Sequence, residues 1–399
     1  MLRTSRVDAS LIFGLGLAFF VGCGDGKVVP PGDHPDASTQ DSGNGGDGGA
    51  MDSGNTEVDG GGGADLGVGD TGAGDTGGGA NPITAPARTW TWIDFPESAC
   101  DNGTATGIGI NLGDDRKNLM IFMNGGGACW DQITCTIANT ATHGPFGQAQ
   151  FTALGAALNG GFFDRNNANN IFKDWSYVFV PYCTGDVHAG DNVANYGAPY
   201  HHTGHKNMVA FLDRLAATFT APEKVLMSGS SAGGFGAALN YVAARDRWAT
   251  PKMYLLDDSG PALPGNYIPA SERDAWYSAW NIGEILDPLC GQDCHTDFSI
   301  AMRNLAQKYP NDRMALLSSL QDNVIRGFVN LSGPEFETGL RQLGTDVLDP
   351  LPNFKYFFIT GQSHTMLGNP SGFNSNGHNL VDWVTQELTD DPNWASTKP

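Results

Sequence analysis

Six short segments of the chain are apolar over their whole length instead of alternating between apolar and polar residues. Such runs are typical of strands that are buried on both faces of a parallel sheet. Between them lie segments whose apolar residues recur at helical spacing, most clearly at 205–219 and 377–388. We therefore expect an α/β fold in which helices flank a mostly parallel central sheet. The six predicted strands are KNLMIFMN (117–124), WSYVFVPY (175–182), KVLMSG (224–229), KMYLLD (252–257), RMALLSS (313–319) and FKYFFIT (354–360).

The loops after these strands are where we expect functional residues, because sites in such sheets form outside the carboxyl ends of the strands. In one loop, Gly229-Ser230-Ser231-Ala232-Gly233 matches the pattern G-x-S-x-G. In a nucleophile elbow of this kind, the central serine lies on a strained turn between a strand and a helix, and only small neighbours fit. Ser231 is thus the candidate nucleophile. A Ser/Gly loop at the start of a helix is the alternative interpretation.

The segment MNGGGACW (123–130) follows an earlier strand and contains three glycines that let the backbone approach a substrate. In hydrolases with such a glycine loop, N–H groups of the loop and the N–H after the nucleophile bind the oxyanion. Here those donors would be Gly127 and Ala128 together with Ala232. The loop is weak support by itself, and it gains weight because the elbow is also present.

An acid and then a histidine should follow the nucleophile, each just after a strand. Asp322 follows the next-to-last predicted strand and His364 follows the last. His364 would accept the serine proton, and Asp322 would fix the tautomer of the imidazole. Three competitors stay open at this point, namely His378 for the base and Asp257 or Asp258 for the acid.

Four histidines near PYCTGDVHAG and YHHTGHKN raise a second hypothesis, a metal site. His201 and His205 have the i, i+4 spacing of ligands on a helix, but no glutamate that could act as general base lies between them. Roles in lining a cleft or starting a helix explain these residues better, and a serine mechanism needs no cofactor. We expect no metal and no cofactor. The four residues are His188, His201, His202 and His205.

The first 23 residues are typical of an export signal. Arg3 and Arg6 precede an apolar core at 11–21, which is too short to span a bilayer. The core ends in FVGC, which resembles a bacterial lipobox and predicts that Cys23 is lipidated after cleavage. An ordinary secretory signal is the alternative. Either signal exports the protein, which would stay at the cell envelope if Cys23 carries lipid and would otherwise be secreted.

Residues 24–85 are rich in Gly, Asp, Ser and Thr and contain almost no large apolar side chain. Such a segment cannot bury a core, so we expect a disordered linker that holds the following domain on the order of 40 Å from its anchor. Residues 86–399 suffice for one α/β domain. Of the chain's net charge of −21, this domain carries −12, which argues against binding nucleic acid. We expect a monomer.

Seven cysteines fit an oxidising compartment, and six are left to pair if Cys23 carries lipid. Two pairs are close enough to close small loops and leave one distant pair for a third disulfide, a connectivity that spacing alone does not prove. A metal site is the weaker interpretation because no pair has CxxC spacing. The three pairs are Cys129–Cys135, Cys290–Cys294 and Cys100–Cys183.

Five segments resemble the pectin acetylesterase/Notum family in order and spacing: CDNGTATGIGINL, NGGGACW, PYCTGDVHAG, GSSAGGFGAALNY and DDSG. The resemblance runs from about Cys100 to His378. It implies an α/β-hydrolase-like fold and a carboxylesterase whose triad is Ser231, Asp322 and His364. Plant and animal members have Trp directly before the first cysteine of the glycine loop, where this chain has Ala128 and a Trp only at position 130.

We therefore expect an exported serine esterase that removes acetyl groups from a polysaccharide such as pectin through an acyl-enzyme. The negative charge of the domain fits poorly with pectin, which is itself anionic. Two alternatives stay open: an esterase for lipid-linked or protein-linked acyl groups, and a catalytically silent surface binding module on the same fold. Ala128 opens space beside the acyl group, and we expect Trp130 to fill that space, which would favour acetate.

Overall fold

The computed structural model of the protein describes residues 81–399. The predicted export signal, Cys23 and residues 24–80 of the predicted linker lie outside the described residues. Ile83 is only 1% exposed, and its N–H donates to Thr218 Oγ1 at 2.8 Å. The packed chain therefore extends at least three residues upstream of the predicted boundary at 86, because Ile83 contributes its side chain to the core.

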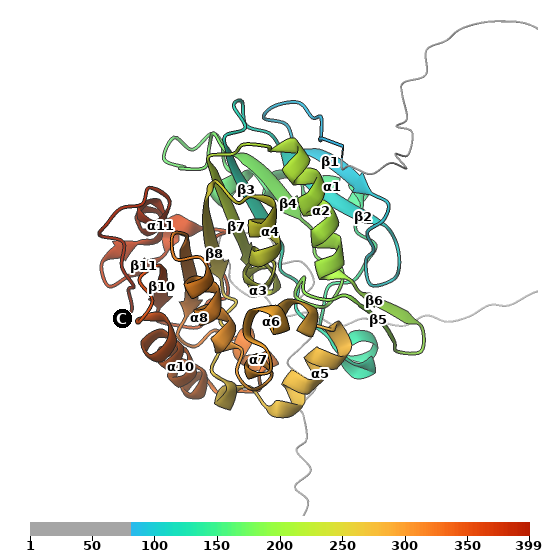
Figure 1. Cartoon of the computed structure of the whole chain (residues 1–399), viewed down its shortest axis with the longest axis vertical. Helices are drawn as coiled ribbons and strands as arrows, with labels where there is room; N and C mark the ends of the chain where they lie inside the picture. The colour runs from blue at the N-terminus through green and yellow to red at the C-terminus, as the bar shows by residue number, and fades with distance from the viewer. Residues whose placement is uncertain (1–80) are drawn as a thin grey trace, which may run out of the picture. The chain divides into compact units, whose positions relative to one another are not determined.

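Eight strands form the central sheet, in the order β1-β2-β4-β3-β7-β8-β9-β10 (Figure 1). The six strands from β4 to β10 in this order run parallel, and they are the six predicted from the continuous apolar runs. The prediction of an α/β-hydrolase-like fold with a mostly parallel sheet is thus confirmed. The strands are β1 (Thr91–Phe95), β2 (Thr106–Asn111), β3 (Asn118–Met123), β4 (Ser176–Val180), β7 (Lys224–Ser230), β8 (Lys252–Asp258), β9 (Arg313–Ser319) and β10 (Phe354–Ile359).

The sequence pattern does not predict β1 and β2, which extend the sheet in antiparallel pairing. Glycines interrupt the apolar residues of β2 (TGIGIN), so it lacks a continuous run. A Cβ at Gly109 would lie 2.2 Å from Cε2 of Phe151, and a Cβ at Gly107 would lie 2.0 Å from the carbonyl oxygen of Ile93. Glycine is therefore required where β2 pairs with β1 and meets α1 (Gln148–Leu154).

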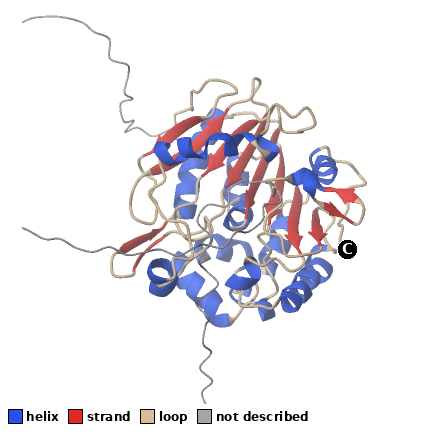
Figure 2. Cartoon of the chain, turned by 180° about the vertical axis from the view of Figure 1, so that it is seen from behind, coloured by secondary structure: helices blue, strands red, loops and turns tan. Residues whose placement is uncertain are grey.

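Helices cover both faces of the sheet (Figure 2). The side chains of β3 alternate between two apolar cores. Leu119 and Ile121 pack in a core shared with α2 and α4, whereas Met120 and Phe122 pack in a core shared with α1 and α11. Water is excluded from both faces of the sheet, which is why the parallel strands are apolar throughout. The additional helices are α2 (Gly204–Thr218), α3 (Ala232–Leu239), α4 (Tyr241–Arg247) and α11 (Leu380–Leu388).

Of the two helices predicted most clearly, α2 agrees with the structure to within one residue, whereas α11 begins three residues later than predicted. Asn379 caps α11 by accepting the N–H of Val381 on its side chain at 2.9 Å. The residues before the cap form a hairpin of β11 (Asn374–Ser375) and β12 (His378–Asn379). Gly377 turns this hairpin with a φ of 85°, so the predicted helical start at 377 is wrong.

Four helices between β8 and β9 lie at the end of the sheet where α3 begins (Figure 1). Their apolar side chains pack against the glycine loop and the start of α3, around Ala128 and Ala232. We call this segment the cap. It consists of α5 (Ala270–Trp280), α6 (Gly283–Cys290), α7 (Asp293–Thr296) and α8 (Ser299–Lys308).

Three disulfides join the same cysteine pairs that were expected from the sequence: Cys100–Cys183, Cys129–Cys135 and, in the cap, Cys290–Cys294. Within residues 81–399 no helix is long and apolar enough to cross a membrane. The smaller elements include β5 (Asn192–Asn195), β6 (Pro199–His202), α9 (Ile325–Phe328) and α10 (Gly333–Gln342).

Candidate active site

Ser231 lies at the tip of a sharp turn between β7 and α3. Its φ of 61° and ψ of −123° fall in a region that residues other than glycine rarely adopt, which is the strain typical of a nucleophile elbow. Two neighbours must be glycine for the turn to form. A Cβ at Gly229 would lie 2.2 Å from the carbonyl oxygen of Gly233, and a Cβ at Gly233 would lie 2.0 Å from that of Met123. The G-x-S-x-G pattern therefore follows from the steric limits of this turn.

His364 and Asp322 form a pair beyond the ends of β10 and β9. Nδ1 of His364 lies 2.9 Å from Oδ2 and 3.1 Å from Oδ1 of Asp322. Asp322 is 0% exposed, and its Oδ1 also accepts the N–H groups of Val324 and Ile325 at 2.9 and 3.0 Å. Because the carboxylate faces Nδ1, that nitrogen carries the proton and Nε2 is left to act as a base.

The competing candidates make other contacts. Ser230 donates its hydroxyl to Oδ2 of Asp258 at 2.7 Å. Asp257 accepts the N–H of Gly260 on Oδ1 at 2.8 Å, while its Oδ2 is buried without a hydrogen-bond partner among the described residues. Burial raises the pKa of Asp257 well above its usual range. His378 is exposed in the β11–β12 hairpin. None of these residues is part of a histidine–carboxylate pair.

The glycine loop after β3 is held by two side chains that sequence reasoning does not single out for this task. His188 Nε2 lies 2.8 Å from the carbonyl oxygen of Asn124, and the Tyr182 hydroxyl donates to the carbonyl oxygen of Gly127 at 2.9 Å. Burial lowers the pKa of His188 to about 4, so the ring is neutral and donates through Nε2. The motif PYCTGDVHAG contains both residues and gives the one signal that could have found them.

Two further histidines of the metal hypothesis, His202 and His205, have protein partners, while His201 lies half-buried in β6. His202 Nδ1 lies 3.0 Å from the carbonyl oxygen of Thr184, and burial lowers the pKa of His202 to about 4. His205 Nδ1 lies 2.7 Å from Oδ1 of Asn240. Across residues 81–399, no group of three or more His, Cys, Asp or Glu residues is arranged to hold a metal ion.

A large apolar pocket opens beside Ser231. Its cavity volume is about 110 Å³, and Gly127, Ala128 and Ala232 line it together with the serine. Its other walls come from α3, from the segment after β8, from the cap and from the segment after β9, so it joins parts of the chain that are distant in sequence. These walls include Phe235, Ile268, Leu286, Phe298, Met302 and Ile325.

Trp130 forms one wall of this pocket and does not fill it, which contradicts the expectation from the sequence. The ring packs edge-on against Trp276 and Trp280 of the cap, with centroids 5.8 and 6.4 Å apart. Trp276 and Trp280 stack on each other at 5.7 Å, and Nε1 of Trp280 donates to the carbonyl oxygen of Cys129 at 2.8 Å. The aromatic cluster holds Trp130 against the cap, so the space beside Ala128 stays open.

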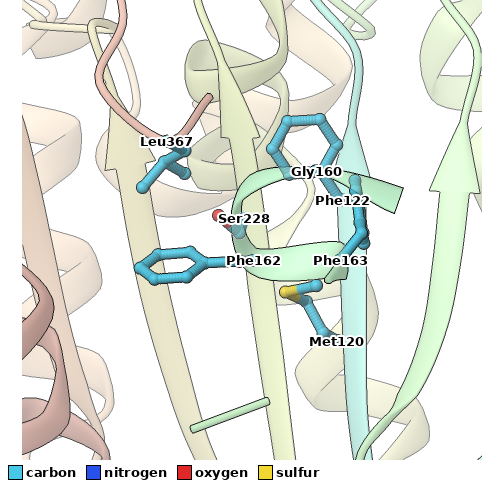
Figure 3. Close-up of a pocket in the computed structure, with 7 residues that line it drawn as sticks. All are labelled: Met120, Phe122, Gly160, Phe162, Phe163, Ser228 and Leu367. Atoms are coloured by element: carbon cyan, nitrogen blue, oxygen red, sulfur yellow. The ribbon is translucent and has the colours of Figure 1, made fainter. Parts of the chain in front are cut away.

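A second, much smaller pocket, with a cavity volume of about 10 Å³, lies against the sheet between Phe122, Phe162, Phe163 and Leu367 (Figure 3). Its one hydroxyl group belongs to Ser228, which donates to the carbonyl oxygen of Leu256 at 2.9 Å. No histidine or carboxylate lines this pocket. It therefore lacks the groups that nucleophilic catalysis requires.

Comparisons with known proteins agree with this geometry. A family profile described as pectinacetylesterase matches residues 91–308, which is more than half of the chain. Palmitoleoyl-protein carboxylesterase NOTUM of Schmidtea mediterranea is 29% identical over 153 residues, covering 37% of this chain and 29% of the relative. Palmitoleoyl-protein carboxylesterase notum2 of Xenopus laevis is 27% identical over 144 residues, covering 35% and 29%. The matched region thus spans less than a third of the length of these relatives.

Proposed function

Since the chain belongs to the pectinacetylesterase family, we propose that it is a carboxylic ester hydrolase and that Ser231, His364 and Asp322 form its catalytic triad. The strained elbow at Ser231 and the hydrogen bond between His364 and Asp322 support this assignment. Both are features that a serine esterase requires and that a binding module on the same fold would not need.

In this mechanism Ser231 Oγ attacks the ester carbonyl while His364 Nε2 accepts the serine proton. The N–H groups of Gly127, Ala128 and Ala232 bind the oxyanion of the tetrahedral intermediate. His364 then returns the proton to the leaving alcohol. Water, activated by the same imidazole, attacks the acyl-enzyme and releases the free acid.

The acyl group is a medium or long hydrophobic chain. The observation that carries this proposal is the pocket beside Ser231, which is lined by apolar residues apart from that serine and is larger than an acetyl group needs. Each buried methylene of an acyl chain contributes about 0.8 kcal/mol, so such a pocket favours longer chains. The relatives named as palmitoleoyl-protein carboxylesterases are consistent with this substrate class.

Removal of acetyl groups from a polysaccharide such as pectin is the second candidate. The description of the family as pectinacetylesterase favours it. The open pocket weighs against it, because an acetyl group would leave most of the apolar walls exposed to water. The domain charge of −12 also disfavours an anionic polysaccharide.

Export of the protein is consistent with its three disulfides, which persist in oxidising compartments. Within the same proposal, Cys23 carries a lipid that anchors the protein to the cell envelope, and residues 24–80 connect this anchor to a monomeric esterase domain.

Hydrolysis of p-nitrophenyl esters whose acyl chains range from acetate to palmitate tests the substrate class. The Ser231→Ala variant measures the background hydrolysis. We expect kcat/KM to be at least about tenfold higher for octanoate than for acetate, since two buried methylenes alone contribute about 1.6 kcal/mol. A parallel panel of acetylated polysaccharides measures acetate release. A higher kcat/KM for acetate esters, with rapid deacetylation of a polysaccharide, would overturn the assignment to long acyl chains.

A further inference from the structure

The carboxylate of Asp258 joins the serine elbow to the histidine loop. On one side, it accepts the hydroxyl of Ser230 on Oδ2 at 2.7 Å. On the other side, it accepts the N–H of Met366 at 2.9 Å and the N–H of Leu367 at 3.0 Å. Ser230 directly precedes Ser231, and Met366 follows His364 by two residues. One buried side chain therefore contacts the residue directly before the proposed nucleophile and two residues shortly after the proposed base.

The backbone of Asp258 makes a further link to the elbow. Its carbonyl oxygen accepts the N–H of Ser231 at 2.7 Å. The next residue, Ser259, accepts the N–H of Thr365 on its hydroxyl at 3.3 Å, so the strand end contacts the histidine loop a second time. The position of Ser231 relative to the histidine loop thus depends on the end of β8.

Three residues with a strained backbone lie close to this carboxylate. Ser231, Ser259 and Thr365 have φ values of 61°, 68° and 63°. Residues other than glycine rarely adopt such positive values. Such conformations cost of order 1–3 kcal/mol each and persist only when surrounding contacts hold them. Each of the three strained residues adjoins a hydrogen bond made by Asp258 or Ser259. The hydrogen bonds of Asp258 and Ser259 can therefore stabilise these strained backbone conformations.

We propose that Asp258 is a positioning residue that sets the distance and orientation between Ser231 and His364. This inference rests on the proposed function, because it assumes that these two residues react together. Asp258 acts through Ser230, the Ser231 N–H and the loop at 366–367, and it does not itself transfer a proton. Misplacement of reacting atoms by about 1 Å can cost about 100-fold in rate, so loss of this link should lower kcat.

The carboxylate fits this role better than an amide would. Its oxygens face two hydroxyls, of Ser230 and Ser259, and two backbone N–H groups, all of which donate. Burial raises the pKa of Asp258, whereas the N–H groups of Leu367 and Met366, the Ser230 hydroxyl and nearby His364 lower it. Asp258→Asn would direct an amide N–H₂ toward at least one of these donors and so disrupt the link with little change in volume.

Asp257 provides a matched control. It is equally buried at the same strand end, but its side chain accepts only the N–H of Gly260 and forms no hydrogen bond with Ser230 or the histidine loop. Ser230→Ala provides a milder test, because it removes a single hydrogen bond of Asp258 and leaves the carboxylate in place.

The experiment measures kcat, KM and the rate of fluorophosphonate labelling of Ser231 in the full chain, with the thermal midpoint as a folding check. For Asp258→Asn we expect kcat and the labelling rate to fall about 100-fold with KM within about threefold. For Ser230→Ala we expect a fall in kcat of about fivefold, and for Asp257→Asn a kcat within about twofold of wild type.

The outcomes separate this inference from the proposed function. If wild type is active and Asp258→Asn keeps wild-type kcat, or loses only thermal stability, the positioning role is refuted and the esterase assignment stands. If Asp258→Asn does not fold, Ser230→Ala decides, and an unchanged kcat refutes the role. A loss in Asp257→Asn as large as in Asp258→Asn would also refute it, since the effect would then be general. A wild-type protein with neither hydrolysis nor labelling would overturn both proposals.

Discussion

Nδ1 of His364 lies 2.9 Å from Oδ2 of Asp322, and the carboxylate that orients the imidazole is itself anchored by backbone N–H groups. Asp322 is fully buried, so little water competes for its oxygens. The orientation of the His364 ring is therefore set by the backbone after β9, one strand away from the histidine loop. In the proposed triad, an imidazole held in this way would need little reorganisation during catalysis.

Removal of the base should nearly abolish hydrolysis. We expect His364→Ala and Asp322→Asn each to lower kcat by about 10⁴-fold, because a triad member cannot be replaced by its neighbours. His378→Ala is the control, since this exposed hairpin residue should leave kcat unchanged. Steady-state kinetics with a p-nitrophenyl ester measures all three variants. A dead His378→Ala variant with an active His364→Ala variant would mean that the base has been assigned to the wrong loop.

The stability contributed by His188 should depend on pH. Burial holds the pKa of His188 at about 4 in the folded state, below about 6.5 for an unfolded chain. The unfolded state therefore binds the extra proton first, and stability is lost as pH falls from about 6.5 to about 4. The free energy of unfolding of wild type should drop by about 3 kcal/mol relative to His188→Gln across this window. Urea denaturation at several pH values measures it, and a difference that is constant with pH would contradict the prediction.

Filling the pocket should shift the preference for acyl length. Ala301 of α8 lines the pocket. In Ala301→Phe, the added ring would occupy pocket space that a long acyl chain needs. We expect kcat/KM to fall at least about tenfold for octanoate while it stays within about threefold for acetate. Gln307→Phe, on the exposed face of the same helix, controls for the added ring. Equal losses on both esters would indicate general damage to the fold, and the thermal midpoint would reveal it.

Much of the scaffold could be predicted because each of its elements has a pattern that lies within a short sequence segment. The parallel strands are covered on both faces, so each forms a continuous apolar run. The elbow could be predicted because Gly229 and Gly233 have no room for a Cβ. Asp322 and His364 follow adjacent parallel strands, and the carboxyl ends of such strands meet at one edge of the sheet. The sequence positions alone therefore favoured the pair that the structure brings together.

The acyl pocket could not be predicted, because its walls come from segments that are distant in sequence. The spacing of apolar residues in the cap helices shows which face is buried, but it does not tell whether that face packs on the core or covers a site. The position of Trp130 depends on Trp276 and Trp280, about 150 residues away, and so the expectation that it fills the pocket was wrong. β2 was missed because Gly107 and Gly109 serve close packing and break its apolar run.

If Cys23 carries the proposed lipid anchor, its substitution should change where the protein is found without changing its esterase activity. Cys23→Ser should move the protein from the membrane fraction to the soluble fraction and leave kcat/KM unchanged, because the residue lies 60 positions before Ile83, the first buried core residue of the described chain. Fractionation and esterase assays on both forms measure this. Wild-type protein that is already soluble would refute the lipid anchor and favour plain secretion.

The identity of the nucleophile is the central claim, and covalent labelling tests it most directly. A fluorophosphonate probe reacts with a serine only when a base activates its hydroxyl, so it distinguishes an esterase from a silent binding module. We expect one adduct per chain, mapped by peptide mass spectrometry to Ser231, lost in Ser231→Ala and retained in Ser230→Ala. No adduct on the folded wild-type protein, or an adduct on Ser230, would contradict the account.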